Sequence, residues 1–283
     1  MDYRNELQRA KLEFTRAGFA EIDAEMLLAH LLGISRMELH NGVKLEEALS
    51  RFEDHSIIDD QFRSACARRL IGEPVQYITG EAYFRELTLQ VGEGVLIPRP
   101  ESELLVSQIL THLSLRKKVT SVIDLGSGSG ALALAIATEA PNSRVIAVES
   151  DPAALIWLRK NVEASSSEVK IVAEDVASAL DGVKADIVIA NPPYIPNAQE
   201  LPFEVKNYEP HFALYGGKKG MEVPLIFMAA AARLLKSGGL LVIEHGEDQG
   251  DLVAGALALD FGQIKVHLDL NQRPRWTSAE RLA

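Results

Sequence analysis

Hydrophobic and polar positions follow a helical period in the first part of the chain. Residues 1 to about 73 are interpreted as helical segments, and in the last of them the apolar residues recur every three or four positions, as on one face of a helix. The last such stretch carries this face on Ile58, Phe62, Ala65, Cys66 and Leu70. Earlier segments are expected to end at Gly18 and Gly33, since glycine suits a left-handed helix C-cap. Residues 1–73 are therefore predicted to form a small helical domain, with Cys66 in its core.

The pattern changes between residues 74 and 100. Two stretches rich in β-branched and aromatic residues, 75–79 and 84–91, flank Gly80. Such stretches around a glycine are typical of strands joined by a turn. We therefore predict a hairpin-like connector at 74–100.

The connector ends in the sequence LIPRPESE. Pro98 and Pro100 remove backbone donors and favour an extended chain. Two roles are open for this arm. It is a linker between domains, or it holds charged side chains over a site, namely Arg99, Glu101 and Glu103.

Residues 101–283 alternate between short apolar runs and amphipathic stretches. Strands are predicted at 119–125, 144–149, 170–173, 185–190, 240–244 and 264–270, and helices at 130–139, 152–164, 221–236 and 248–260. The final RWTSAERL is a candidate for one more strand. Strands that are apolar throughout and alternate with helices indicate a parallel sheet buried on both faces, as in α/β folds.

Composition places the chain among ordinary globular proteins. Its 283 residues suggest about two domains, and 47% are hydrophobic against 24% charged. The single cysteine excludes a disulfide framework or a cysteine-built metal site. No His, Asp and Glu cluster has metal-ligand spacing, so no metal is expected. The richest apolar run, 131–137, is too short to span a bilayer, and we expect a cytoplasmic protein without membrane contact.

The charge is strongly acidic. Lys and Arg total 29 against 40 Asp and Glu, a formal net charge of −11. Both the first 75 residues and the remainder are net negative, which disfavours a large nucleic-acid footprint because duplex binding depends on basic residues. Local basic pairs such as Arg68–Arg69 are expected on the solvated surface.

A glycine loop follows the first predicted strand of the larger region, in the sequence DLGSGSG. Gly126, Gly128 and Gly130 permit a tight turn at a helix N-terminus and let a ligand approach the backbone. The next strand ends in Glu149, whose carboxylate suits the two hydroxyls of a ribose and repels a 2′-phosphate. The loop also matches a dinucleotide fingerprint, so NAD remains an alternative at this point. Ser127 and Ser129 are interpreted as loop residues rather than nucleophiles.

A second motif ends the strand at 185–190. The chain continues as Asn191-Pro192-Pro193-Tyr194, in which the prolines remove two N–H donors and leave carbonyl acceptors. The Asn191 side chain adds an oxygen acceptor. Two acceptors suit an NH₂ group, and the tyrosine would cover the planar group that carries it. We therefore predict a clamp that presents an amide or exocyclic amine nitrogen to an electrophile.

Together these motifs resemble class I S-adenosylmethionine-dependent N-methyltransferases. The segments RRLIGEPVQYITGEAYF, GVLIPRPESELLV, DLGSGSGALALAIA, NPPYIP, EVKNYEPHFALYGGKKG and GGLLVIEHG narrow the resemblance to the HemK/PrmC family, closely over about residues 65–246. Members of that family methylate N5 of the glutamine in the Gly-Gly-Gln loop of peptide-chain release factors. The resemblance implies a Rossmann-like α/β domain at 101–283 with a mixed, mostly parallel sheet. The helical domain at 1–73 is then expected to recognise the substrate.

The resemblance also implies residue roles. The methionine part of the cofactor is expected at Gly126, Ser127, Gly128, Ser129 and Gly130, the ribose at Glu149, and further cofactor contacts at Val176 and Asn191. The glutamine amide is expected at Asn191 and the Pro192 carbonyl, with Pro193 and Tyr194 completing its pocket; Asn191, Pro192 and Tyr194 are the expected catalytic residues. S-adenosyl-L-methionine would leave as S-adenosyl-L-homocysteine.

This chain departs from the family pattern at three places. The ribose position is commonly Asp and is Glu149 here, and the arm reads PRPES where PRPET or PRPDT is usual. Many relatives have Asp-Trp after the third strand, with the aromatic against adenine. Here the pair is Asp175–Val176, which leaves the adenine contact open.

Other functions are weighed against this one. A nucleic-acid amino-methyltransferase could use the same clamp, an NAD-linked oxidoreductase would leave the clamp unexplained, and a noncatalytic module would only bind cofactor. The partners expected are release factors, without direct nucleic-acid binding. His211 and His245 are interpreted as structural, and Glu204 and Glu209 as solvated loop charges.

Overall fold

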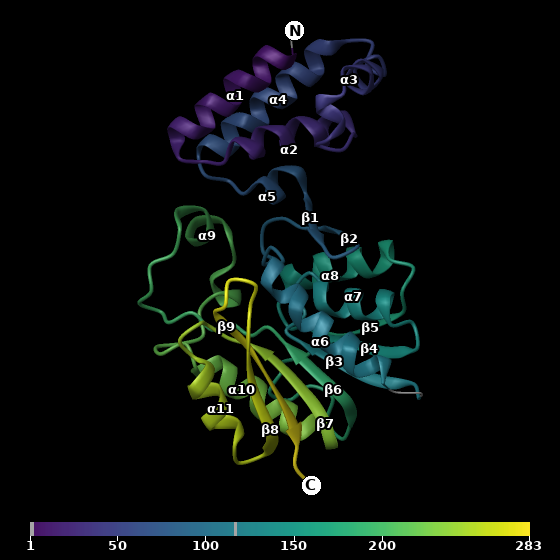
Figure 1. Cartoon of the computed structure of the whole chain (residues 1–283), viewed down its shortest axis with the longest axis vertical. Helices are drawn as coiled ribbons and strands as arrows, with labels where there is room; N and C mark the ends of the chain where they lie inside the picture. Colours follow the sequence, from purple (N-terminus) through teal and green to yellow (C-terminus); the bar gives the residue numbers. More distant parts are fainter. Residues whose placement is uncertain (1–2, 116–117) are drawn as a thin grey trace. The chain divides into compact units, whose positions relative to one another are not determined.

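The computed structural model describes residues 3–115 and 118–283 (Figure 1). The chain divides into two compact units. One comprises the residues up to Gly80 together with Pro202–Tyr208, and the other comprises Glu81–Leu201 and Glu209–Ala283. The division therefore falls at Gly80, later than the boundary expected near residue 73.

The first unit is helical, as predicted. Its elements are α1 (Tyr3–Ala17), α2 (Glu21–Leu32), η1 (Glu38–His40), α3 (Gly42–Leu49), α4 (His55–Leu70), α5 (Val75–Thr79) and α9 (Phe203–Tyr208). Gly18 and Gly33 adopt φ of 84° and 62°, the left-handed conformation expected at these helix ends. Cys66 lies in the hydrophobic core, and burial raises the pKa of its thiol to about 12, which confirms its structural interpretation.

The prediction of a strand at 75–79 is wrong. These residues form α5, one helical turn that follows Pro74 and ends at Gly80 in a left-handed conformation with φ of 76°. The turn directs Val75 and Ile78 towards the core of the first unit. Packing and the flanking turn residues thus outweigh the β propensity of the segment. The predicted hairpin follows directly after Gly80, as β1 (Glu81–Phe84) and β2 (Leu87–Gln90).

A buried ion pair joins distant segments of the first unit. Arg69 is only 6% exposed, and its Nε and Nη1 donate to Asp23 Oδ2 at 2.8 Å and to Glu204 Oε2 at 2.7 Å. Its guanidinium also lies over the Phe19 ring, 4.1 Å from the centroid. Arg69 and Glu204 are therefore not the solvated charges that we expected. Their pairing attaches the segment Pro202–Tyr208 to the first unit.

Replacement of Arg69 by alanine should destabilise the first unit. Removing one partner of a buried ion pair leaves the other charge uncompensated, and we expect a loss of about 3 kcal/mol in the free energy of unfolding. Arg9→Ala is the matched control, because the Arg9–Glu13 pair is exposed and is expected to contribute little to stability. Chemical denaturation measures both. Equal effects would contradict the role given to Arg69.

The second unit contains a seven-stranded sheet in the order β5-β4-β3-β6-β7-β9-β8. The strands are β3 (Thr120–Leu125), β4 (Ser143–Val148), β5 (Val169–Val172), β6 (Ala185–Ala190), β7 (Leu235–Glu244), β8 (Phe261–Leu268) and β9 (Pro274–Arg281). The first five pair in parallel, whereas β9 runs antiparallel to β7 and β8. The expected mixed, mostly parallel sheet and its C-terminal strand are confirmed.

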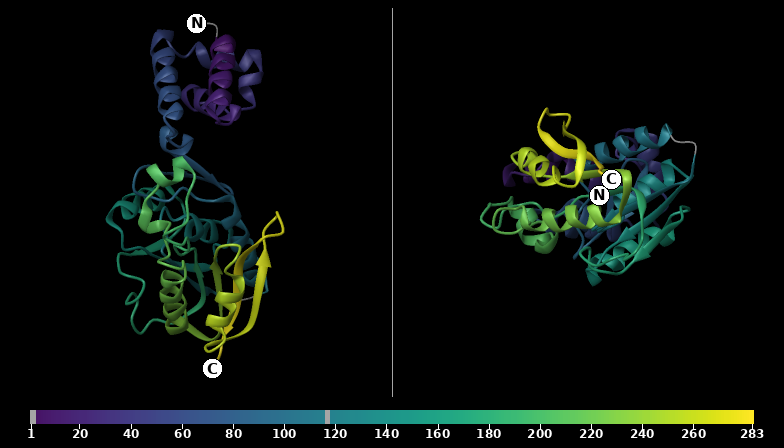
Figure 2. Two further views of the ribbon diagram at one scale, coloured as in Figure 1. Left: turned by 90° about the vertical axis from the view of Figure 1, so that its left-hand side faces the viewer. Right: turned by 90° about the horizontal axis from the view of Figure 1, so that it is seen from below.

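Helices cover both faces of this sheet (Figure 2). Neighbouring residues of a strand point to opposite faces, so Val122 packs with one helical layer and Ile123 with the other. The first layer consists of α6 (Glu103–Ser114), α7 (Ala131–Glu139) and α8 (Pro152–Ala164), and the second of α10 (Glu222–Leu234) and α11 (Gly250–Leu257). Two single turns, η2 (Pro100–Ser102) and η3 (His211–Ala213), complete the unit.

The strand order creates a switch point between β3 and β6. From β3 the chain moves outward to β4 and β5, then returns to the other side of β3 as β6. In open α/β sheets the crevice at the carboxyl ends of such strands is the usual ligand site. Across the described ranges, every helix is too short or too polar to cross a membrane.

Candidate active site

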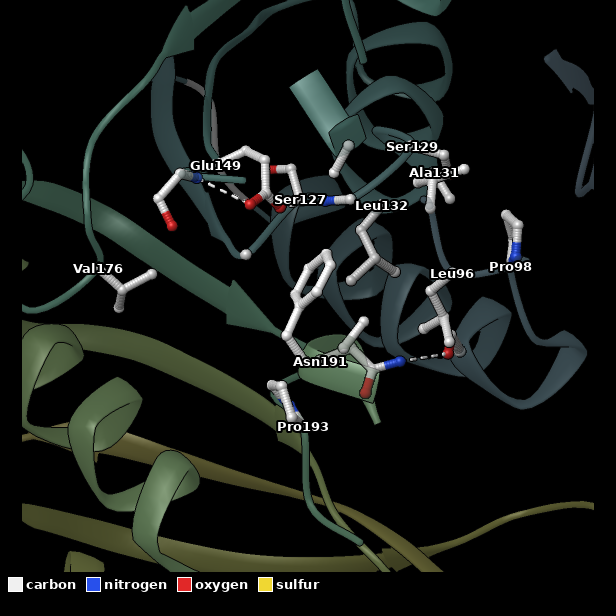
Figure 3. A pocket seen from close by; sticks show the side chains of 18 of the residues that line it. Leu96, Pro98, Ser127, Ser129, Ala131, Leu132, Glu149, Val176, Asn191 and Pro193 are labelled. Carbon is white, nitrogen blue, oxygen red and sulfur yellow. Dashed lines mark hydrogen bonds between the residues drawn. The ribbon is translucent and has the colours of Figure 1, made fainter. Parts of the chain in front are cut away.

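A cavity of about 260 Å³ lies at the carboxyl ends of the central strands of the second unit. It combines loop backbone, polar side chains and an apolar wall (Figure 3). The sequence-predicted residues that line it are Gly126, Ser127, Gly128, Ser129, Glu149, Val176, Asn191 and Pro193. Among the described residues, Gly130, Pro192 and Tyr194 lie outside this lining. The structure thus brings together most of the predicted cofactor and substrate positions.

The glycine loop is fixed to the end of the neighbouring strand. The N–H groups of Gly126 and Ser127 donate to the carbonyl of Val148 at 2.9 and 3.0 Å. Gly126 has φ of 69°, and a Cβ there would lie 2.9 Å from Cε1 of Phe227. The loop therefore requires glycine at this position for both conformation and space. Gly130 instead packs inward, where a Cβ would meet Leu158 at 2.7 Å.

Glu149 follows β4 and is 8% exposed. Its Oε1 accepts hydrogen bonds from the N–H groups of Ser150 and Asp151 at 2.8 and 2.9 Å, and Oε2 accepts from Gly128 at 2.9 Å. These bonds hold the carboxylate against the glycine loop. A carboxylate oxygen can accept two hydrogen bonds, so Oε2 retains capacity for a hydroxyl donor in the cavity.

Asp124, at the end of β3, was not identified from the sequence. It is completely buried, and its Oδ2 accepts a hydrogen bond from the N–H of Ala133 at 3.2 Å. Burial is the main reason that the pKa of this carboxyl is raised to about 7. An acidic residue within the apolar run VIDL was the signal available. The Asp124 side chain links β3 to the first turn of α7 beneath the glycine loop.

Asn191 reaches the cavity directly after β6. Its Nδ2 donates to Ser102 Oγ at 3.2 Å, along the dashed line drawn from Asn191 in Figure 3. Ser102 in turn donates to Glu244 Oε2 at 2.5 Å, and the Tyr194 hydroxyl donates to Glu244 Oε1 at 3.3 Å. The phenol of Tyr194 therefore points to a buried carboxylate, and burial raises its pKa. Neither Ser102 nor Glu244 was identified from the sequence, although Glu244 ends an apolar strand as Glu149 follows one.

The proline-rich arm contributes to the cavity. Pro98, Arg99 and Ser102 line it. Arg99 Nη2 pairs with Glu209 Oε1 at 2.6 Å, while Glu209 Oε2 accepts the N–H of Ile97 at 3.2 Å. Glu209 is only 4% exposed, so its interpretation as a solvated loop charge is wrong. The arm holds part of the site, and the loop after NPPY is bonded to it.

The two histidines have structural contacts. His245 is completely buried, with Nδ1 2.8 Å from the Gly246 carbonyl and Nε2 3.0 Å from Thr277 Oγ1. Burial lowers its pKa. His211 packs edge-on against Tyr215, with ring centroids 5.5 Å apart.

The apolar end of the cavity includes Val176. It is 8% exposed and clusters with Phe227 of α10, and both line the cavity with Val223 and Ile226. The described lining of the cavity therefore includes the aromatic ring of Phe227 from α10, whereas position 176 is aliphatic. Within the described ranges no group of three or more His, Cys, Asp or Glu side chains forms a metal site.

Gly216 supports the turn that carries the NPPY motif. A Cβ at this position would lie 2.5 Å from the Pro193 carbonyl oxygen and 2.7 Å from Tyr194 Cα, which are rigid backbone atoms. We expect Gly216→Ala to displace the turn, to lower the thermal unfolding temperature and to lower turnover by roughly tenfold or more. In the matched control Gly255→Ala, the described chain has no atom within 4 Å of the new Cβ, and helix propensity predicts a gain of about 0.5–1 kcal/mol. Thermal unfolding and turnover of both variants test the assignment.

Solved structures share this fold. The chain superimposes on a T. thermophilus 16S rRNA methyltransferase in complex with AdoMet and guanosine with a TM-score of 0.52 and 23% identity, over 71% of this chain and 49% of that chain. It superimposes on a methyltransferase from Pyrococcus furiosus with a TM-score of 0.53 and 17% identity, over 77% of this chain and 98% of that chain. The fold is that of S-adenosylmethionine-dependent methyltransferases.

Sequence comparison identifies the family. Residues 6–80 match the PrmC N-terminal domain, and residues 100–206 match the methyltransferase small domain. The release factor glutamine methyltransferase of Mycolicibacterium smegmatis is 41% identical, with 99% of this chain and 98% of that protein aligned. The corresponding enzyme of Streptomyces coelicolor is 39% identical, with 92% and 90% aligned. This chain belongs to the release factor glutamine methyltransferase family.

Proposed function

We propose that this protein transfers a methyl group from S-adenosyl-L-methionine to N5 of the glutamine in the Gly-Gly-Gln motif of peptide-chain release factors. The observation that carries the proposal is the position of Asn191, which reaches the same cavity as the glycine loop and Glu149. The names of the relatives, which align over nearly the whole chain, support the same acceptor. A release factor substrate makes the proposed activity cytoplasmic.

The residues of the cavity fit the cofactor. Gly126 to Ser129 present backbone to its methionine part, and the remaining acceptor capacity of Glu149 suits its ribose hydroxyls. Val176 and Phe227 provide apolar surface for its adenine. When bound, S-adenosylmethionine supplies an electrophilic methyl group on a sulfonium. The acidic Glu149 also disfavours a 2′-phosphorylated dinucleotide.

Asn191 and Pro192 are the groups proposed to hold the substrate. An amide nitrogen is a weak nucleophile because its lone pair is delocalised into the carbonyl. Acceptance of its two N–H groups by Asn191 Oδ1 and the Pro192 carbonyl favours pyramidalisation and stabilises the developing positive charge. The alkylated nitrogen is acidic and loses its proton readily, so no strong base is required. Pro193 and Tyr194 are proposed to shape the pocket around the amide.

The first unit is proposed to recognise the release factor outside its glutamine loop. Residues 6–80 match the PrmC N-terminal domain, and the described helices of this unit contribute no residue to the lining of the cavity. With intact enzyme, kcat/KM for the whole release factor should then exceed that for a short Gly-Gly-Gln peptide by about tenfold or more, since added contacts contribute binding energy. Equal values would assign all recognition to the cavity.

A parallel labelling experiment tests the acceptor. Purified protein receives labelled S-adenosylmethionine with a release factor, its Gly-Gly-Ala variant, duplex DNA or structured RNA. Label in the unmodified release factor alone is expected. Label in DNA or RNA instead would support a nucleic-acid amino-methyltransferase, and cofactor binding without transfer to any acceptor would contradict the proposal.

A further inference from the structure

A chain of three side chains runs from the cavity into the protein. Asn191 follows β6, Ser102 belongs to η2 and Glu244 ends β7. Asn191 Nδ2 lies 3.2 Å from Ser102 Oγ, which lies 2.5 Å from Glu244 Oε2. Ser102 is 4% exposed and Glu244 is 1% exposed. Glu244 is therefore buried, and Ser102 bridges its carboxylate to the Asn191 side-chain amide.

The hydrogen bonds of this chain run in one direction. An ionised carboxylate only accepts, so the single hydroxyl proton of Ser102 is directed to Glu244. The oxygen of Ser102 is then left to accept, and Nδ2 is the only part of the Asn191 side chain that can donate to it. If the amide were reversed, two acceptors without a proton between them would face each other. The direction set at Glu244 thus leaves Oδ1 of Asn191 for the substrate.

We propose that Glu244 is a positioning residue that acts through Ser102 to hold the Asn191 amide in the orientation that offers its oxygen to the substrate nitrogen. This inference rests on the proposed function and extends it to two residues outside the NPPY motif. A reversed amide would present two N–H donors to the substrate NH₂ and would repel it. The orientation therefore separates an active clamp from an inactive one.

The groups around Glu244 determine the pH range in which the hydrogen bonds from Asn191 through Ser102 to Glu244 keep their direction. The titratable and charged groups near it are Tyr194, whose hydroxyl donates to Oε1, together with Arg275 and Glu101. Burial is the main cause that raises the pKa of Glu244 to about 7. Protonation below that pH gives the carboxyl a donor of its own, and the direction of the Ser102 hydroxyl is no longer fixed. The orientation of Asn191 should accordingly weaken as the pH falls through about 7.

Two readouts test the inference in full-length protein. The first is solvent exchange of the Asn191 side-chain NH₂ by ¹⁵N NMR, with the signal assigned by its loss in Asn191→Asp. The second is kcat for release factor methylation from pH 6 to pH 8.5, with cofactor affinity measured by calorimetry. The variants are Glu244→Gln, Ser102→Ala and Ser102→Thr. Glu280→Gln, an exposed acid on β9, is the matched control.

Loss of either polar partner should release the amide. In Ser102→Ala and Glu244→Gln, exchange should accelerate at least tenfold, and kcat should fall by roughly 10- to 100-fold at pH 8 with cofactor affinity unchanged. The double variant should be no worse than the more damaged single variant, because both act in one chain. Ser102→Thr, which keeps the hydroxyl, should recover most of the activity. The ratio of wild-type to Glu244→Gln activity should rise with pH through about 7.

The opposing outcomes are distinct. Unchanged exchange and kcat in Glu244→Gln, additive losses in the double variant, or a ratio independent of pH would overturn the positioning role. Equal loss of cofactor affinity and thermal stability in all three variants would assign Ser102 and Glu244 to the fold instead. If wild-type protein methylates no release factor, the proposed function fails, while the exchange measurement still decides how Asn191 is held.

Discussion

Replacement of Asn191 by alanine is expected to lower kcat for methyl transfer by about 10²- to 10³-fold, the usual effect of removing one polar group that stabilises a transition state. The side chain reaches the cavity and is held by Ser102 rather than by the cofactor loop. Cofactor affinity should therefore change by less than about threefold. Steady-state kinetics with a release factor and calorimetry with S-adenosylmethionine measure the two effects separately.

The matched control for this substitution is Asn197→Ala in the same loop. Asn197 is exposed, and its backbone N–H donates to the Gly217 carbonyl at 2.9 Å, a bond that alanine retains. Its turnover should equal that of the wild type. If Asn191→Ala turns over as fast as the wild type, the proposed clamp is wrong. If both variants lose turnover equally, the loss is due to a disturbed loop.

The second large effect is expected at Glu149. Its carboxylate accepts three backbone hydrogen bonds beside the cavity and is proposed to accept from the ribose. Alanine should weaken cofactor binding by roughly 10- to 100-fold, because hydrogen bonds to a charged group contribute about 1.5–3 kcal/mol each. Calorimetric titration with S-adenosylmethionine gives the dissociation constant directly.

Exposed Glu163 on α8 provides the control for charge alone. Glu163→Ala removes the same charge from the second unit without touching the cavity, and should leave the dissociation constant within about twofold. An unchanged constant in Glu149→Ala would refute the ribose role. If the wild-type protein binds a nicotinamide dinucleotide more tightly than S-adenosylmethionine, the result would support the NAD alternative that the glycine loop left open.

Local patterns were sufficient to predict the larger part of the fold. The strand at 185–190 and the helix at 152–164 have the predicted bounds, because an apolar run and a helical period are both short-range signals. The segment 75–79 shows the limit of this reasoning. Its residues favour a strand, but Pro74, Gly80 and the core of the first unit select a helical turn. That choice depends on contacts outside the segment.

The candidate site likewise contains residues that could be predicted from the sequence and residues that could not. Asn191 and Glu149 follow strands and belong to short motifs, so their positions could be predicted from the sequence alone. Ser102 and Glu244 lie 142 residues apart, and only the pairing of the strands and the path of the arm bring them together. Arg69 and Glu204, 135 residues apart, were misread as solvated for the same reason. Pairings of charges across such separations are a property of the fold.

Tandem mass spectrometry of a release factor identifies the residue that this protein methylates. The factor is incubated with S-adenosylmethionine and either wild-type protein or Asn191→Ala, then digested and sequenced. We expect one methyl group on the side-chain amide of the glutamine in Gly-Gly-Gln after incubation with the wild type, and almost none after incubation with the variant. A methyl group on any other residue, or an unmodified release factor after incubation with active wild-type protein, would contradict the proposed function.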